Sequence, residues 1–419
     1  LSKKFDKIEV VEIISGGPAW RQNLLEVGDI ILKVRQNDQD ESESTSILGM
    51  PISDAVKLIK GPKGTNVILT IKKVDGEVLD LKIKRDIVLL EETYVRSSIV
   101  SKDKNLYGFI NLPKFYIDFD NSTSRDAARD VKKEIIRLKN LGVKGLVLDL
   151  RNNGGGSLKT VVEMAGLFIQ EGPIVQVRSM DKESKILRDK DRSIIWEGPL
   201  VILVNEFSAS ASEILAAAMQ DYKRAIIIGS KQTYGKGTVQ NVLDLNKMVR
   251  SNTNGDLGAL KFTTQKYYRI NGGSTQLEGV KSDIVVPDKY TYVDFGEKDQ
   301  KNPLEWDKID PVSYEPWKTF FDYNKTIQAS KNRMNSSEFI SLIDENAKWI
   351  KSIRNRDIYT LNYKKFKENL LINEEKAKKY KKLSDYSSNL TFKSLPYEID
   401  LIAKDSSLGE KRKRWHKNL

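Results

Sequence analysis

The chain has 419 residues, which is too long for one ordinary hydrophobic core, so we expect two or three domains. Hydrophobic residues make up 39% of it and charged residues 31%, as is typical of globular domains. It has no cysteine, which excludes a thiol nucleophile, a thiolate metal site and disulfides. The single histidine, His416, lies in a basic stretch at the C-terminus and argues against a Ser-His-Asp triad. A hydrolase of this composition would need Lys, Asp, Glu or Tyr as its base.

The net charge of +12 raises the question of nucleic acid binding. Most of the positive excess lies in residues 321–419, where aromatic residues do not alternate with basic ones and no zinc-finger spacing occurs. We therefore interpret this region as a solvated helical surface, or a weak contact to an acidic partner. No apolar run approaches the roughly 20 residues of a membrane-spanning helix. The start at Leu1 carries no signal-peptide pattern and is expected to lie within a longer protein.

The first 90 residues alternate between strand and turn patterns. Apolar residues at positions 52, 55, 56 and 59 form the stripe of an amphipathic helix over 52–59. Strands are expected at 8–14, 66–72 and 79–85, and residues 27–34 are expected to form a tight turn that leads into a further strand.

This order resembles a PDZ domain, which binds a peptide as an added strand and holds its terminal carboxylate in a glycine-containing loop. That loop would lie just upstream of residue 1, so tail binding by the present chain stays open. A small β domain without a ligand is the alternative interpretation.

Longer apolar runs, separated by helical patterns, follow the first 90 residues. The runs at 143–150, 200–204 and 225–229 are nearly continuous, as in strands buried on both faces. A further strand is expected at 106–112, with helices at 157–169 and before Gly142, the latter capped by hydroxyls at 122–124. Strands that alternate with helices predict a layered α/β core.

Residues 208–218 join a strand end, a turn rich in hydroxyl groups and a strong helix-forming run. Such a junction places Ser210 and backbone N–H groups at a helix N-terminus, where developing negative charge is stabilised. The alternative is simple N-capping, in which Ser210 or Ser212 bonds to the backbone and Glu213 supports the first turn.

A second motif, at residues 232–240, places Lys236 between two glycines directly after a buried strand. Flanking glycines suit a lysine whose backbone turns sharply against a neighbouring helix. Burial would lower its pKa and leave a neutral amine able to accept a proton, and Gln240 could orient that amine. The spacing of a phosphate-binding loop is absent.

A third motif, Asp149 to Leu158, contains three consecutive glycines at 154–156 between a buried strand and a helix. Glycines allow the backbone to approach a substrate and to direct N–H groups toward it. The pattern of a dinucleotide site is missing.

Together the three motifs resemble the S41 family of C-terminal processing peptidases, most closely its tail-specific members from the bacterial periplasm. The resemblance extends through 271–276 and 279–287, and more loosely to the end. It implies a serine endopeptidase that needs no metal or organic cofactor. It also implies protein or peptide substrates with exposed C-termini, allows for an adaptor protein as a further partner, and places the protein in the periplasm.

The resemblance also assigns roles to single residues. Ser210 corresponds to the nucleophile and Lys236 to the base of a Ser-Lys dyad, with Gln240 as the partner that orients the lysine. The oxyanion hole corresponds to the N–H groups of Ala211 and Gly156, and Gly155 is a less favoured donor. The loop at 230–233 is one residue longer than the family pattern.

The expected fold is a multidomain α/β (α+β) chain. It consists of a PDZ-like β domain at 1–90, an S41 protease core at 91–300 and a helical C-terminal extension at 301–419. An independent partner-binding module is the alternative for the last segment. For the whole chain, the alternatives are a PDZ-containing scaffold that binds peptides without cleaving them and a crotonase-like acyl-CoA enzyme, for which no adenine or pantetheine signature occurs.

Overall fold

The computed structural model describes the chain except at residues 12, 14–16, 20–23, 27, 38, 74–75, 87–92, 119–123, 180–181, 250–254, 294, 319–320, 356–357, 384–385 and 405. The chain divides into two compact units. One consists of Leu1–Glu92 and Pro396–Leu419, and the other of Thr93–Leu395.

Residues 1–86 form an antiparallel sheet with a helix, α2 (Ile52–Ile59), that matches the predicted amphipathic segment. The strands are β1 (Ser2–Lys4), β2 (Lys7–Glu9), β3 (Ile30–Gln36), β4 (Thr45–Ser46), β5 (Asn66–Lys72) and β6 (Val78–Lys84), in the order β1-β2-β3-β5-β6 with β4 beside β3. Alternate strand residues such as Val67, Leu69 and Ile71 are buried, as expected of a sheet with one covered face. The strand predicted at 8–14 ends at Glu9, and its residues 12 and 14 lie outside the described chain.

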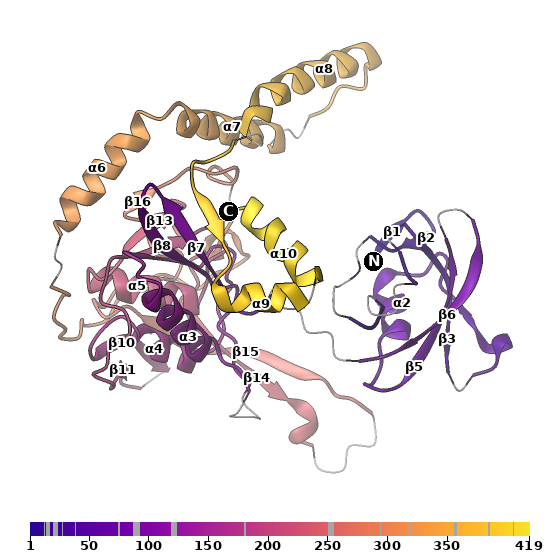
Figure 1. Ribbon diagram of the computed structural model, residues 1–419, viewed down its shortest axis with the longest axis horizontal. Helices are drawn as coiled ribbons and strands as arrows, with labels where there is room; N and C mark the ends of the chain where they lie inside the picture. Colours follow the sequence, from indigo (N-terminus) through magenta and orange to yellow (C-terminus); the bar gives the residue numbers. More distant parts are fainter. Residues whose placement is uncertain are drawn as a thin grey trace. The chain divides into compact units, whose positions relative to one another are not determined.

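The larger unit is built on a seven-stranded sheet of order β16-β13-β12-β9-β8-β7-β17 (Figure 1). Its strands are β7 (Arg96–Lys102), β8 (Asn105–Asn111), β9 (Leu146–Asp149), β12 (Leu200–Val204), β13 (Ile226–Gly229), β16 (Ile284–Val285) and β17 (Thr391–Lys393). In this sheet β8, β9, β12, β13 and β16 run parallel to one another. β7 is antiparallel to both of its neighbours, β8 and β17. The three apolar runs predicted as doubly buried strands are the adjacent strands β9, β12 and β13, which confirms the α/β class of the core.

α-Helices lie in the crossover connections between β8, β9, β12 and β13, whereas β13 and β16 are connected through two strands of a second sheet. The helices are α3 (Ala127–Asn140), α4 (Leu158–Ala165) and α5 (Ala211–Asp221). The predicted cap of α3 at 122–124 is wrong: residues 122 and 123 lie outside the described chain, and the N-cap is Asp126, whose carboxylate accepts a hydrogen bond from the Arg129 amide at 2.8 Å. A carboxylate at this position also meets the positive end of the helix dipole.

A second, four-stranded sheet of order β11-β10-β15-β14 belongs to the same unit. Its strands are β10 (Gly172–Ser179), β11 (Lys185–Asp189), β14 (Thr238–Asp244) and β15 (Ala259–Tyr268). Neighbouring strands are antiparallel throughout, and β14 lies at one edge.

The C-terminal region is mainly helical, as predicted. Its helices are α6 (Tyr323–Asn335), α7 (Glu338–Arg354), α8 (Tyr363–Tyr380), α9 (Pro396–Lys404) and α10 (Ser406–Lys417). Short 3-10 helices occur at Glu41–Glu43, Leu245–Lys247, Glu297–Asp299 and Lys381–Leu383. Over the residues that the structure describes, none of the helices is both long and apolar enough to cross a membrane.

An ion pair joins the end of α5 to the end of β15. The Asp221 carboxylate accepts from Arg269 Nη2 at 2.5 Å and from Nε at 3.1 Å, and the Asn271 amide adds a third bond at 2.9 Å. The two charged side chains are only 6% and 16% exposed. Because both charges are largely removed from water, each depends on the other for its stabilisation.

We therefore expect Asp221→Ala to lower the free energy of unfolding by about 3–5 kcal/mol, since it leaves the Arg269 charge buried without its partner. Urea unfolding followed by circular dichroism measures this loss. Glu278→Ala is the matched control, because it breaks an exposed pair with Lys281 whose removal costs about 1 kcal/mol or less. Equal losses in the two variants would contradict the expectation.

Candidate active site

The three predicted motifs follow three adjacent parallel strands of the core sheet. The glycine-rich motif begins at the end of β9, Ser210 follows β12, and Lys236 follows β13. Because the strands are parallel, their carboxyl ends lie at one edge of the sheet, where open α/β folds place their ligands. The fold therefore brings together segments as far apart in the sequence as Gly155 and Lys236, which are separated by 81 positions.

Ser210 is the N-cap of α5, in the turn that follows β12. Its backbone has φ 57° and ψ −113°, a left-handed conformation that is strained for a residue other than glycine. A similar strained turn between a strand and a helix presents the nucleophile in α/β hydrolases. Ser208 attaches this turn to the end of β9, because its hydroxyl donates to the Leu150 carbonyl at 2.8 Å.

Glu213, three residues further on, is completely buried and accepts hydrogen bonds on both carboxylate oxygens. Its Oε2 accepts from the amide of Ser210 at 2.7 Å and from the amide of Lys236 at 3.1 Å. Its Oε1 accepts from the amide of Gly235 and from the hydroxyl of Thr233, both at 2.7 Å. One carboxylate oxygen thus fixes the backbones of Ser210 and Lys236 beside each other.

Tyr267, on β15, connects the same two residues through their backbone carbonyl groups. Its buried hydroxyl is hydrogen bonded to the Lys236 carbonyl and lies 3.3 Å from the Ser210 carbonyl. The Thr275 hydroxyl donates to the same Lys236 carbonyl at 3.0 Å. The peptide units at Ser210 and Lys236 are therefore held from both their amide and their carbonyl sides.

The glycine-rich motif packs directly against Ser210. A Cβ atom added to Gly155 would lie 2.8 Å from Ser210 Cβ and 3.0 Å from the Ala211 nitrogen, so only glycine allows this approach. At Gly156, with φ 148°, an added Cβ would lie 2.2 Å from the Phe115 carbonyl oxygen. The Gly155 amide already donates to Asn153 Oδ1 at 2.9 Å. Ala211 occupies the first helical position of α5, where an N–H group has no acceptor within its own helix.

The Lys236 side chain is half-buried, and its Nζ donates to Gln240 Oε1 at 3.1 Å. Burial lowers the pKa of Lys236, and the nearby positive charge of Lys261 lowers it further, while Glu297 and Glu213 oppose the shift. Burial raises the pKa of Glu213 to about 7, although its four hydrogen-bond donors favour the carboxylate form.

The backbones of Ser210 and Lys236 are thus joined through Glu213, and Gln240 contacts Lys236. Ala211 follows Ser210 in α5, and Gly156 follows Gly155, which packs against Ser210. Sequence reasoning did not identify Tyr267 and assigned Glu213 only a capping role. The signal for Glu213 was its position three residues after Ser210, which is that of a capping box. Nothing in the sequence around Tyr267 distinguishes it from an ordinary strand residue.

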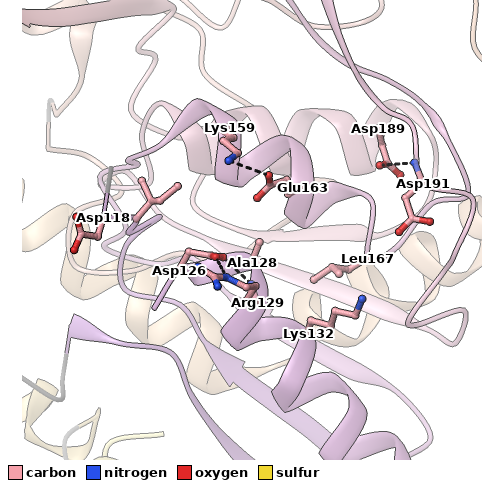
Figure 2. Close-up of a pocket in the computed structure, with 11 residues that line it drawn as sticks. Asp118, Asp126, Ala128, Arg129, Lys132, Lys159, Glu163, Leu167, Asp189 and Asp191 are labelled. Atoms are coloured by element: carbon pink, nitrogen blue, oxygen red, sulfur yellow. Dashed lines mark hydrogen bonds and ion pairs between the residues drawn. The ribbon is translucent and has the colours of Figure 1, made fainter. Parts of the chain in front are cut away.

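A charged pocket of about 510 Å³ lies elsewhere on the core, over α3, α4 and β11 (Figure 2). None of the predicted site residues lines it. Two ion pairs lie among its charged side chains: Arg129 with Asp126, and Lys159 with Glu163 at 3.8 Å. Among the described residues, no cluster of three or more His, Cys, Asp or Glu side chains could hold a metal ion.

A separate, mainly apolar groove of about 750 Å³ lies within residues 1–86. Ile52, Val56 and Ile59 of α2 line one side, and strand residues such as Val67 and Leu69 line the other. A PDZ domain adds an extended peptide to an exposed edge of its sheet and holds alternate side chains of that peptide in pockets.

Comparison with known families agrees with this architecture. Residues 106–286 match the model of peptidase family S41, residues 2–72 match that of the PDZ domain, and residues 290–419 match the C-terminal domain of tail specific protease. The chain belongs to peptidase family S41, and its S41 segment lies between a PDZ domain and this C-terminal domain.

The curated relatives of the chain include bacterial proteases. The chain is 37% identical to the tail-specific protease of Haemophilus influenzae over 97% of its own length and 57% of that protein. It is 36% identical to the carboxy-terminal-processing protease of Bartonella bacilliformis over 68% of its length and 60% of that protein. A solved photosystem II D1 C-terminal processing protease is 28% identical, with a TM-score of 0.40, over 67% of this chain and 68% of that one. The chain thus spans well under two thirds of the length of these curated relatives.

We expect Glu213→Gln to lower kcat for peptide hydrolysis by about 10- to 1000-fold, because the new NH2 group would face N–H donors that now meet an acceptor. KM should change little, because the Glu213 side chain is fully buried and does not line the groove beside α2. Steady-state kinetics on an unfolded polypeptide measure both constants. Glu163→Gln, on the exposed face of α4, is the control and should behave as the parent chain. A variant with parental kcat would contradict this positioning role.

Proposed function

We propose that the chain is a serine endopeptidase in which Ser210 is the nucleophile and Lys236 the general base. The observation that carries this proposal is the shared acceptor: one oxygen of Glu213 receives the amides of both residues. A dyad requires its two side chains to start from adjacent backbone positions, and this carboxylate supplies that adjacency.

The surroundings of Lys236 suit a general base. Burial and the charge of Lys261 lower its pKa, so more of the amine is neutral near physiological pH than for a solvated lysine. Gln240 Oε1 accepts one N–H of this amine, which restricts its rotation and lets its lone pair point to Ser210. This is the role that we propose for Gln240.

The N–H groups of Ala211 and Gly156 are the proposed oxyanion hole. Ala211 lies at the positive end of the α5 dipole, where negative charge is stabilised. Gly156 is the better second donor, because the amide of Gly155 is already bonded to Asn153.

The reaction would proceed in two stages. Lys236 Nζ accepts the hydroxyl proton of Ser210 as Oγ bonds to the substrate carbonyl carbon, and the oxyanion accepts hydrogen bonds from the two N–H groups. The lysinium then gives its proton to the leaving amide nitrogen as the C–N bond breaks, which leaves an ester on Ser210. A water molecule loses its proton to Lys236 and attacks the ester, and the lysinium returns a proton to Ser210 Oγ.

We further propose that substrates are proteins and peptides with exposed C-termini. The apolar groove beside α2 would accept an apolar residue of such a tail. In functional terms the segments would be a tail-binding domain at 1–90, the catalytic core at 91–300 and the helical extension at 301–419. The name of the Haemophilus influenzae relative, a tail-specific protease, supports the tail specificity, and a periplasmic location is the corresponding proposal.

Ser210→Ala and Lys236→Ala should each abolish hydrolysis of an unfolded polypeptide and leave the circular dichroism spectrum unchanged. A sulfonyl fluoride or peptide boronate followed by mass mapping should label the unsubstituted chain at Ser210. This experiment separates the enzyme from a scaffold that binds peptides without cleaving them. An unlabelled chain without turnover would support the scaffold.

The rate of hydrolysis should rise with pH across the neutral and alkaline range. The neutral fraction of Lys236 grows as pH approaches its lowered pKa, which lies below the usual value of about 10.4. Below about pH 7, protonation of Glu213 removes an acceptor and lowers the rate further.

Measurement of kcat/KM at constant ionic strength gives this profile. Lys261→Met should move the rise to higher pH, because it removes a positive charge that lowers the pKa of Lys236. A profile that is flat from about pH 6 to about pH 10 would be inconsistent with a lysine base.

A further inference from the structure

Strands β14 and β15 form an antiparallel ribbon that reaches out from the core (Figure 1). β14 is the edge strand of its sheet, so among the described strands it has a neighbour on one side only. An edge strand presents unpaired N–H and C=O groups to which an extended peptide can bind.

One face of this ribbon carries exposed apolar side chains. Asn241 lies opposite Phe262 and Leu243 opposite Leu260, and residues two apart on a strand point to the same face. Leu243, Leu260 and Phe262 therefore share a face, and they are 36%, 51% and 40% exposed. Exposed apolar groups that gather on one surface favour a docking role.

The ribbon is continuous with the candidate active site. β14 begins at Thr238, two residues after Lys236, and the Gln240 side chain contacts Lys236 Nζ. Leu243 is seven residues beyond Lys236, which is at most about 23 Å of extended chain. An extended polypeptide with a carbonyl group at Ser210 would cross this distance within about seven of its own residues.

The size of the surface suits a transient, extended occupant. Three partly exposed side chains on a two-stranded ribbon fall far short of the roughly 800 Å² per partner that a stable interface between folded chains buries. An extended peptide needs only an edge and a few apolar contacts.

We propose that the apolar face of the ribbon, formed by Leu243, Leu260 and Phe262, binds an apolar, extended stretch of the substrate that flanks the scissile bond. The ribbon thereby selects cleavage sites in apolar segments of unfolded proteins. This inference rests on the proposed function, and it assigns a specificity surface separate from the groove beside α2.

The test compares two fluorescent peptides that differ only beside a central Ala-Ala, one with Val-Leu-Phe-Val-Leu-Phe on each side and the other with Ser-Asn-Ser-Ser-Asn-Ser on each side. Their affinities are measured by anisotropy on the Ser210→Ala chain, so that no turnover is needed. An identical C-terminus on both peptides makes any contribution of the α2 groove equal. We expect the apolar peptide to bind about tenfold more tightly.

The double variant Leu260→Ser, Phe262→Ser, in the same background, should reduce this ratio to about two or less. Ile136→Ser, on α3 with 42% exposure, is the matched control and should keep the parental ratio. If the double variant has a lowered thermal midpoint, Leu243→Ser alone replaces it. A ratio that survives the ribbon variants overturns the inference. Failure of the chain with Ser210 intact to hydrolyse either peptide would instead count against the proposed function.

Discussion

The arrangement of the site depends on one buried carboxylate. Glu213 is shielded from water on all sides, and such a group is tolerated only if its oxygens are satisfied by hydrogen bonds. Its four donors come from the helix cap at Ser210 and from the loop at 233–236. The need to satisfy Glu213 therefore forces these two segments together, and the relative position of Ser210 and Lys236 follows from it.

The seven-stranded sheet allows the segments that carry Ser210 and Lys236 to approach each other. Three neighbouring parallel strands end at the same edge, and glycines allow the segments beyond them to approach more closely than side chains would permit. A Cβ added to Gly235 would lie 2.9 Å from the Leu277 carbonyl carbon, and one added to Gly237 would lie 2.7 Å from the Gln276 nitrogen. The loop that carries Lys236 is thus packed between the Glu213 carboxylate and the turn at 275–279. Close packing on both sides leaves the backbone at Lys236 little room to move.

The sequence was sufficient for the elements whose patterns are local. The runs that became β9, β12 and β13 are apolar on both faces, and α2 has a clear helical stripe. The two strands β14 and β15 of the second sheet were not predicted. They mix exposed polar and apolar residues, and so show neither the continuous apolar run of a buried strand nor the alternation of a half-buried one. The cap of α3 was misassigned because several hydroxyl residues precede Asp126, and only the tertiary structure selects among them.

Candidate site residues could be named from the sequence only where chemistry restricts the choice. With no cysteine and one terminal histidine, a lysine between glycines directly after a buried strand became a candidate base. The joint role of Glu213 and Tyr267 depends on contacts between segments that are 20 to 60 residues apart, which no local pattern encodes.

The last strand of the core sheet, β17, comes from residues 391–393 and pairs with β7, whose residues lie about 290 positions earlier. During synthesis on a ribosome, β7 would emerge long before its partner and present an open edge to other chains. Closure of the sheet must await the roughly 290 residues that separate β17 from β7, and pairing over so long a separation is slow. Cells that produce the protein would accordingly gain from holding the growing chain away from its neighbours until β17 arrives.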